Sequence, residues 1–214
     1  MGRSSAERSA LTLAALLLAL PAWGQGAGAV QASGLTPAAG PLSVSLTVGA
    51  GLPSDDVFGD IYGSAAVPIV AQVDWRIGSS GLGVFGGLRW VSAAGEAIVE
   101  STSRPGGERV EFGMMSWRVG PTWSVLRGPW ALGAGGGLAY NSFREEWESA
   151  GLRVEDSGVG GVLQGTLERR FARRLSALLR VEYSWFEADA EEGTGLAPVG
   201  LGGIDIAGGI AIRF

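Results

Sequence analysis

The 214-residue chain contains no cysteine, no histidine and no lysine, and all 16 of its basic residues are arginine. Without cysteine there is neither a disulfide framework nor a thiolate metal site. Without histidine the chain lacks the commonest general base and metal ligand, and without lysine it lacks Schiff-base and Ser–Lys chemistry. We therefore predict no catalytic residues, no metal site and no cofactor.

The chain also has little net charge, and what it has in excess is glycine. Its formal net charge of −5 offers no reason to expect nucleic-acid binding. There are 37 glycines, well above the usual share of about 7 %. They follow no three-residue period, which excludes collagen, and a 46 % hydrophobic composition excludes a disordered chain. This combination suits a tightly curved sheet.

The N-terminal segment has the layout of a secretory signal peptide. A short basic region precedes the apolar stretch Ala10–Leu20, and Ala22-Trp23-Gly24 offers small residues to a signal peptidase. Cleavage is predicted after Gly24, with Ala29 as a second candidate. The apolar stretch is shorter than the roughly 20 residues of a spanning helix, although an uncleaved anchor is the alternative. The predicted organisation is a signal peptide at 1–24, a flexible Gly, Ala, Ser and Pro-rich lead-in at 25–41, and one domain at 42–214.

From Leu42 onward the hydrophobic period is two, which indicates β-strands. Eight segments show this alternation: Leu42–Gly51, Val67–Ile77, Leu82–Ala93, Phe112–Val125, Trp130–Phe143, Val159–Phe171, Leu175–Phe186 and Ile204–Phe214. They run to roughly 10 to 14 residues, whereas a membrane strand needs about 9 to 11 and a soluble strand usually has five or six. The lengths favour a barrel that crosses a membrane.

The composition of the two faces decides which side is outside. One face carries most of the tryptophan and isoleucine, and the other carries glycine, serine, threonine and charged residues. A soluble, lipocalin-like barrel is the alternative, but it would bury those charges at a cost of several kcal/mol for each unpaired ion. The predicted fold is therefore all-β: a closed antiparallel eight-stranded transmembrane β-barrel with a polar lumen.

The connections and the aromatic residues support this topology. Three short turns (78–81, 127–129 and 172–174) alternate with four long links (52–66, 94–111, 144–158 and 187–203). Ten aromatic residues on the apolar face form two belts, as a bilayer requires. Those near the short turns are Trp75, Trp123, Trp130, Phe171 and Phe214, and those near the long links are Trp90, Trp117, Tyr140, Tyr183 and Trp185.

The last strand resembles the C-terminal assembly signal of outer-membrane barrels. Gly209, Ile212 and Phe214 match it, whereas Ala207 departs from its polar position and Ile212 is not aromatic. The resemblance implies recognition by the barrel-assembly machinery. Residues 42–214 as a whole resemble the small eight-stranded barrels of the OmpA, OmpX and opacity type, which implies a Gram-negative outer membrane with periplasmic short turns. The lipid A deacylase, lipid A palmitoyltransferase, phospholipase and omptin-protease barrels resemble one another in needing a histidine, so we expect this chain not to be an enzyme.

Parity places nine charged residues in the lumen. They are Asp74, Arg76, Arg89, Arg118, Glu168, Arg180, Glu182, Asp205 and Arg213. Five of them fall at middle depth: Arg89, Arg118, Arg180, Glu182 and Asp205. An eight-stranded interior is about wide enough for side chains to fill, so we predict a salt-bridge plug. An ion-selective constriction is the alternative.

The four long links are acidic, with net charges of −3, −2, −3 and −4, or −12 together. A solvated, repulsive surface is the favoured interpretation, with divalent-cation binding as the alternative. The sequence thus predicts a non-catalytic outer-membrane barrel that displays acidic loops in a structural or adhesive role, contacting outer-membrane lipid and an unidentified surface partner. The second hypothesis is a narrow channel or small-molecule conduit.

Overall fold

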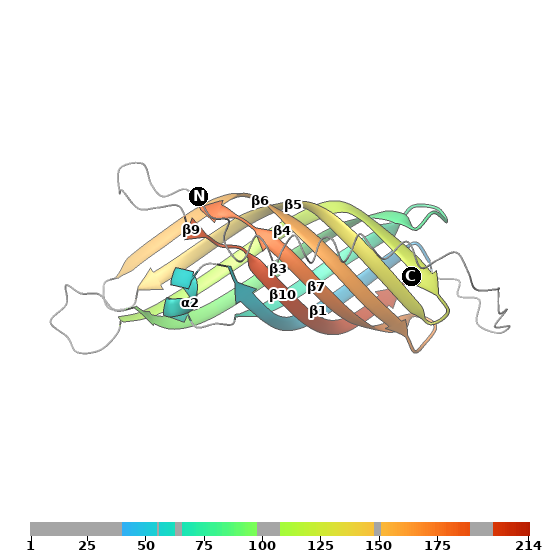
Figure 1. Cartoon of the computed structure of the whole chain (residues 1–214), viewed down its shortest axis with the longest axis horizontal. Helices are drawn as coiled ribbons and strands as arrows, with labels where there is room; N and C mark the ends of the chain where they lie inside the picture. The colour runs from blue at the N-terminus through green and yellow to red at the C-terminus, as the bar shows by residue number, and fades with distance from the viewer. Residues whose placement is uncertain (1–39, 55, 63–65, 98–107, 148–150, 189–198) are drawn as a thin grey trace, which may run out of the picture. The chain divides into compact units, whose positions relative to one another are not determined.

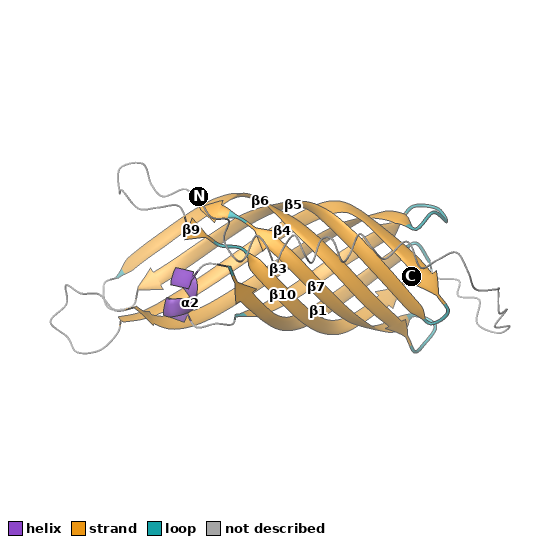
Figure 2. Cartoon of the chain, viewed as in Figure 1, coloured by secondary structure: helices purple, strands orange, loops and turns teal. Residues whose placement is uncertain are grey.

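The computed structural model describes residues 40–54, 56–62, 66–97, 108–147, 151–188 and 199–214. Eight strands close into one antiparallel barrel (Figures 1 and 2). Their bounds are β1 Leu42–Pro53, β2 Val67–Arg76, β3 Leu82–Ala97, β4 Glu108–Arg127, β5 Trp130–Trp147, β6 Leu152–Arg170, β7 Leu175–Trp185 and β10 Gly203–Arg213. The other elements are the helix α2 Asp56–Tyr62 and the mutually paired strands β8 Glu187–Ala188 and β9 Val199–Gly200. No helix in the described ranges is long and apolar enough to cross a membrane.

Each barrel strand pairs with its neighbours in the chain, and β10 closes the circle by pairing with β1. Ser43 lies opposite Arg213 at the short-turn end of this seam. Gly209 is sterically required there, because a Cβ atom on it would lie 2.0 Å from the carbonyl oxygen of Leu46. Closure leaves no open sheet edge, which is the condition for a sheet to exist in hydrocarbon, where no water satisfies free amides.

The barrel wall is apolar outside and polar inside. On β1, Leu46 and Val48 are each 55 % exposed, whereas Ser45 and Thr47 are 3 % and 1 % exposed. A water-soluble protein has the opposite distribution. The distribution in this barrel is explained by an outer face that contacts lipid and a lumen that is polar. The predicted closed antiparallel transmembrane barrel is confirmed.

Aromatic side chains mark both edges of the apolar band. Trp75, Trp123, Trp130, Phe171 and Phe214 are exposed near the short turns. Trp90, Trp117, Tyr140 and Trp185 are exposed toward the other end, where Tyr183 is half-buried. The rings lie on the outer face, where the two interfaces of a bilayer would contact them.

The barrel wall is much longer on one side than on the other. Strands β3 to β6 have 16, 20, 18 and 19 residues, whereas β1, β2, β7 and β10 have 12, 10, 11 and 11. The predicted link 144–158 is wrong, because most of it is strand: β5 continues to Trp147 and β6 begins at Leu152. Arg144 lies opposite Glu155 and donates to its carboxylate at 2.7 Å, so charged cross-strand pairs continue the ladder. The predicted link 94–111 is shorter for the same reason, since β3 and β4 extend into it.

The first long link is also more ordered than predicted. Residues 52–66 were expected to be a plain loop, but helix α2 forms within them. Phe58 and Tyr62, one helical turn apart, share one face of α2, and each is only 9 % exposed. A seven-residue helix is too short for its period to appear in the sequence, so only the contacts that bury these two rings reveal it.

Candidate functional site

The short-turn end of the lumen is bridged by an ion pair between β10 and β6. Arg213 Nε donates to Glu168 Oε1 at 2.9 Å, and Arg213 Nη2 bonds the second carboxylate oxygen. This two-point geometry is the one that a guanidinium and a carboxylate share best. Next to the pair lies a cavity of about 70 Å³ whose lining includes Ser45, Asp74 and Arg180. A water needs about 10–15 Å³ of such space, so the cavity has room for a few waters.

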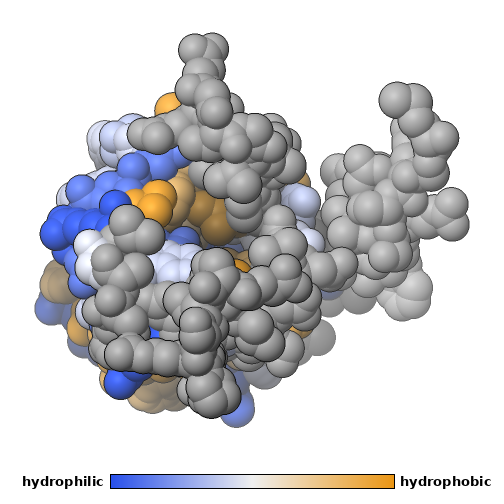
Figure 3. Space-filling model, turned by 90° about the vertical axis from the view of Figure 1, so that its left-hand side faces the viewer, coloured by the Kyte–Doolittle hydropathy of each residue, from blue (hydrophilic) through white to orange (hydrophobic). Residues whose placement is uncertain are grey.

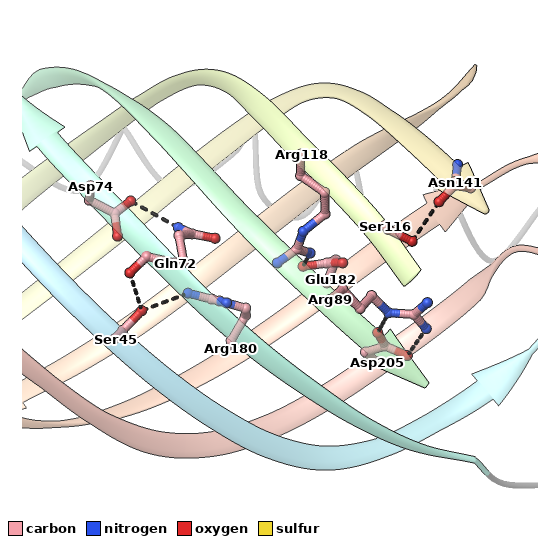
Figure 4. Close-up of polar contacts among 10 residues, drawn as sticks. All are labelled: Ser45, Gln72, Asp74, Arg89, Ser116, Arg118, Asn141, Arg180, Glu182 and Asp205. Atoms are coloured by element: carbon pink, nitrogen blue, oxygen red, sulfur yellow. Dashed lines mark hydrogen bonds and ion pairs between the residues drawn. The ribbon is translucent and has the colours of Figure 1, made fainter. Parts of the chain in front are cut away.

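A hydrogen-bonded group of four residues includes three that line this cavity, Ser45, Asp74 and Arg180 (Figure 4). Gln72 Nε2 donates to Asp74 Oδ1 at 2.9 Å, and Arg180 Nη2 donates to Ser45 Oγ at 3.2 Å. Ser45 Oγ donates in turn to the Gln72 carbonyl at 3.5 Å. Arg180 is 1 % exposed, and its Nε and Nη1 have no hydrogen-bond partner among the described residues. These two nitrogen atoms have almost no accessible surface, so their hydrogen-bonding capacity is not used by the described residues.

Two further ion pairs span the middle of the lumen. Arg118 on β4 pairs with Glu182 on β7, and both side chains are 1 % exposed. Arg89 on β3 binds Asp205 on β10 in two-point fashion, at 2.6 Å from Nε and 3.0 Å from Nη2. Neither pair joins neighbouring strands, so each one crosses the lumen. Figure 4 shows the Arg118–Glu182 pair lying between the Gln72 group and the Arg89–Asp205 pair.

The long-loop mouth of the barrel is filled by apolar side chains instead. We call this cluster the apolar cap; its buried members are Phe58, Tyr62, Ala66, Val91, Val110, Phe112, Met114, Phe143 and Phe186. Phe112 is central, with ring centroids 5.0 Å from Phe58 and 5.5 Å from Tyr62 on one side and 6.1 Å from Phe143 on the other. Figure 3, which looks onto this end, shows hydrophobic residues inside the mouth. Helix α2 therefore closes the mouth by adding two rings to those of the wall.

The cap leaves little free space above the ion pairs. A pocket of about 30 Å³ lies between Phe58, Phe112 and the Arg89–Asp205 pair. Burial of Tyr62, and after it the negative charge of Glu145, raises the pKa of the Tyr62 hydroxyl above its ordinary value of 10.0. The raised pKa means that this hydroxyl is harder to ionise than that of an ordinary tyrosine, which suits a position inside an apolar cluster.

The five predicted mid-depth residues all lie in the lumen. Arg89, Arg118, Arg180, Glu182 and Asp205 are between 1 % and 7 % exposed, and four of them form the two cross-lumen pairs. Arg180 forms no ion pair within 4.0 Å among the described residues and binds a serine instead. Sequence parity also placed Arg213 and Glu168 inside, but it did not show that they pair.

The apolar cap was not predicted from the sequence. Its wall residues Phe112, Met114 and Phe143 have the parity of the lumen, and this could have revealed them, since an aromatic on the polar face breaks the alternation. In the part of the chain that the structure describes, there is no group of three or more carboxylates that could hold a metal ion. The predicted signal peptide, and most of the predicted lead-in, lie outside the described residues.

The residues that resemble an assembly signal lie on the last strand. Ile212 and Phe214 are exposed on the outer face, at 39 % and 56 %, and the Phe214 amide donates to the Leu42 carbonyl at 2.9 Å. Gly209 lies at the closing seam described above. Recognition of these three residues by the barrel-assembly machinery stays a prediction.

In the comparison with known proteins, the chain is similar in fold to several solved structures. No family model and no curated protein matches the chain. Among solved structures, Neisserial surface protein A is similar, with a TM-score of 0.58 at 9 % identity over 81 % of this chain and 97 % of its own. OprG from Pseudomonas aeruginosa gives 0.57 at 11 % identity over 82 % and 96 %. The attachment invasion locus protein Ail of Yersinia pestis, in complex with the heparin analogue sucrose octasulfate, gives 0.50 at 14 % identity over 80 % and 99 %.

These likenesses and the distribution of residues define the class. The chain has the fold of the small eight-stranded outer-membrane β-barrels, as its sequence predicted. A lipid-facing apolar band between two aromatic belts is the form that such a barrel takes in the bacterial outer membrane, and the predicted location there is confirmed. The predicted orientation, with the short turns in the periplasm and the long links outside, stays a prediction.

Proposed function

We propose that the protein is a closed, non-catalytic barrel whose lumen serves stability and whose projecting outer end is the functional surface. The observation that carries this proposal is the filling of the lumen. The Arg118–Glu182 and Arg89–Asp205 pairs block its middle, and the apolar cap blocks its outer mouth. Two barriers of different chemistry lie in series, so opening one leaves the other closed.

The projecting surface is the second part of the proposal. Beyond the outer aromatic belt, β5 and β6 continue as a wall with exposed charged residues, among them Arg144, Glu146, Arg153 and Glu155. With these residues included, the sequence positions 52–66, 94–111, 144–158 and 187–203 carry a net charge of −12. Ail was solved with a polyanionic heparin analogue. An acidic outer end suits the opposite kind of partner, so we expect a cationic surface or a basic protein to contact it.

A narrow conduit is the second candidate function. The cavity of about 70 Å³ and the pocket of about 30 Å³ lie on either side of the central ion pairs, and Arg180 lines the larger one. A rearrangement of the pairs could join these spaces. The two candidates differ in whether the lumen is continuous.

Conductance in planar lipid bilayers distinguishes the two candidates. We expect no conductance from the wild-type barrel. We also expect none from either partial variant, Arg89→Ala/Arg118→Ala/Glu182→Ala/Asp205→Ala or Phe58→Ser/Tyr62→Ser, because each leaves one barrier. The combined variant should give discrete conductance steps. Heat-modifiable gel mobility confirms that every variant is folded. Conductance steps from the folded wild-type protein would contradict the closed-barrel proposal and support the conduit.

A further inference from the structure

The periplasmic rim of the barrel carries an unbalanced group of arginines. We call it the arginine rim; it consists of Arg127, Arg169, Arg170, Arg173 and Arg174, which lie at the β4–β5 and β6–β7 turns, two neighbouring turns of the barrel. All are exposed except Arg170, which is partly buried. No carboxylate within 4.0 Å pairs with any of the five among the residues that the structure describes. Asp74 and Glu168, the described carboxylate side chains of this half of the barrel, line the internal cavity, and of the five arginines the partly buried Arg170 interacts electrostatically with Glu168.

The rim is built into the wall next to the aromatic belt. Trp130 on β5 lies opposite both Arg127 and Arg169 in the ladder, and the Arg169 guanidinium carbon is 5.4 Å from the centroid of its ring. Arg170 holds the β4–β5 turn by donating from Nη2 to the Gly128 carbonyl at 3.0 Å. Trp130 and the neighbouring Phe171 are 44 % and 61 % exposed on the lipid-facing side. The guanidinium groups therefore lie at the level of the belt, where lipid headgroups meet the hydrocarbon.

The opposite rim of the barrel is different. There the exposed arginines Arg144 and Arg153 are neutralised by Glu155, at 2.7 Å and 2.9 Å from their Nε atoms. Each of these two guanidinium groups thus has a carboxylate partner on the same wall. The arginine rim has only one sign of charge, and guanidinium groups match phosphate oxygens in two-point geometry.

We propose that the arginine rim binds the phosphate groups of phospholipids in the periplasmic leaflet, with preference for anionic phospholipids. Three features carry this assignment: five guanidinium groups on adjacent turns, the absence of a paired carboxylate on the rim among the described residues, and the interfacial rings of Trp130 and Phe171 beside them. The ring faces contact the upper acyl chains while the guanidinium groups contact the headgroups. Bound lipid would thereby fix the depth of the short-turn end.

Native mass spectrometry of the whole protein released from detergent tests the proposal. Phosphatidylglycerol is the anionic probe and phosphatidylcholine the zwitterionic one. The wild-type barrel should retain phosphatidylglycerol preferentially. In Arg127→Gln/Arg173→Gln/Arg174→Gln that preference should fall by about tenfold or more, since each arginine near an anionic surface contributes to the attraction. Arg169 and Arg170 are kept, because they also hold Trp130 and the turn.

Two matched variants complete the design. Arg109→Gln/Arg144→Gln/Arg153→Gln removes as many arginines from the opposite rim and should leave the preference unchanged. Arg127→Lys/Arg173→Lys/Arg174→Lys keeps the charge without the guanidinium fork, and should retain part of it. Heat-modifiable mobility checks that each is folded. The proposal is overturned if the wild type shows no preference, if both Gln variants lose it equally, or if inorganic phosphate at the same concentration displaces the lipid, which would make the rim a simple anion site.

Discussion

At its outer end, β4 has apolar side chains inside the barrel and charged side chains outside. In its middle the distribution is the reverse. Near the long loops, Phe112 faces inward and is buried, while Glu111 faces outward and is exposed. A few residues further on, with the same parity, Trp117 faces outward and is 59 % exposed, while Arg118 faces inward and is 4 % exposed. The backbone geometry is continuous, so the difference comes from the surroundings. The first stretch stands in water and follows the rule of soluble proteins, whereas the second is surrounded by lipid.

This change of surroundings along the barrel also explains why ion pairs fill one part of the lumen and apolar side chains fill the other. In the membrane-spanning part, buried arginines must find carboxylates, because an unpaired buried charge is costly. In the projecting part, the wall has an ordinary apolar interior, which α2 completes with Phe58 and Tyr62. The ion pairs and the apolar cap can each be disrupted by separate substitutions, and the expected effects on the protein differ in size and in kind.

The largest effect on stability is expected from disrupting an ion pair in the membrane-spanning part of the lumen. Glu182→Leu leaves Arg118 as an uncompensated buried charge and should lower the free energy of unfolding by about 3–5 kcal/mol. The double variant Arg118→Met/Glu182→Leu should recover most of that loss, because it removes both charges. The free energies of unfolding of the single and the double variant are measured by urea unfolding in lipid vesicles, monitored by tryptophan fluorescence. A double variant as unstable as the single one would show that the pair is needed for more than mutual neutralisation.

A smaller effect is expected in the apolar cap. Phe112→Ala removes the ring that joins α2 to the wall, and the partly solvated mouth can relax around the gap, so we expect a loss of about 3 kcal/mol. The specific sign is release of α2, seen as chymotrypsin cleavage after Phe58 or Tyr62 in the variant and not in the wild type. Met115→Ala, on the lipid face nearby, is the control and should leave α2 protected. Equal protection in both variants would mean that α2 is held by other contacts.

The smallest effect is a pH dependence that belongs to the cap alone. The raised pKa of Tyr62 means that its contribution to stability is complete below the ordinary value of 10.0 and is lost as the pH rises above it. The urea midpoint should therefore be steady up to about pH 10 and then decline toward pH 11.5. Tyr62→Phe has no such group and should show a weaker decline. Parallel curves for both proteins would assign the decline to other groups.

Sequence reasoning was accurate where lipid surrounds the chain and incomplete where water does. The predicted strands stop at Ala93, Phe112 and Phe143, close to the positions where the apolar face changes sides. A search for one continuous apolar face ends at such a point, although the strand continues. The missed extensions and the missed cap are thus consequences of the same inversion.

The sequence by itself determined the eight barrel strands, the face of each that meets lipid and the parity of the nine inward charges, because these depend on local alternation and turn chemistry. Only the tertiary structure decided which charges meet and where α2 goes. Arg89 and Asp205 are 116 residues apart in the chain, and Arg213 and Glu168 are 45 apart. Their contact depends on the register of every intervening strand pair and on closure of the sheet, which no local pattern contains.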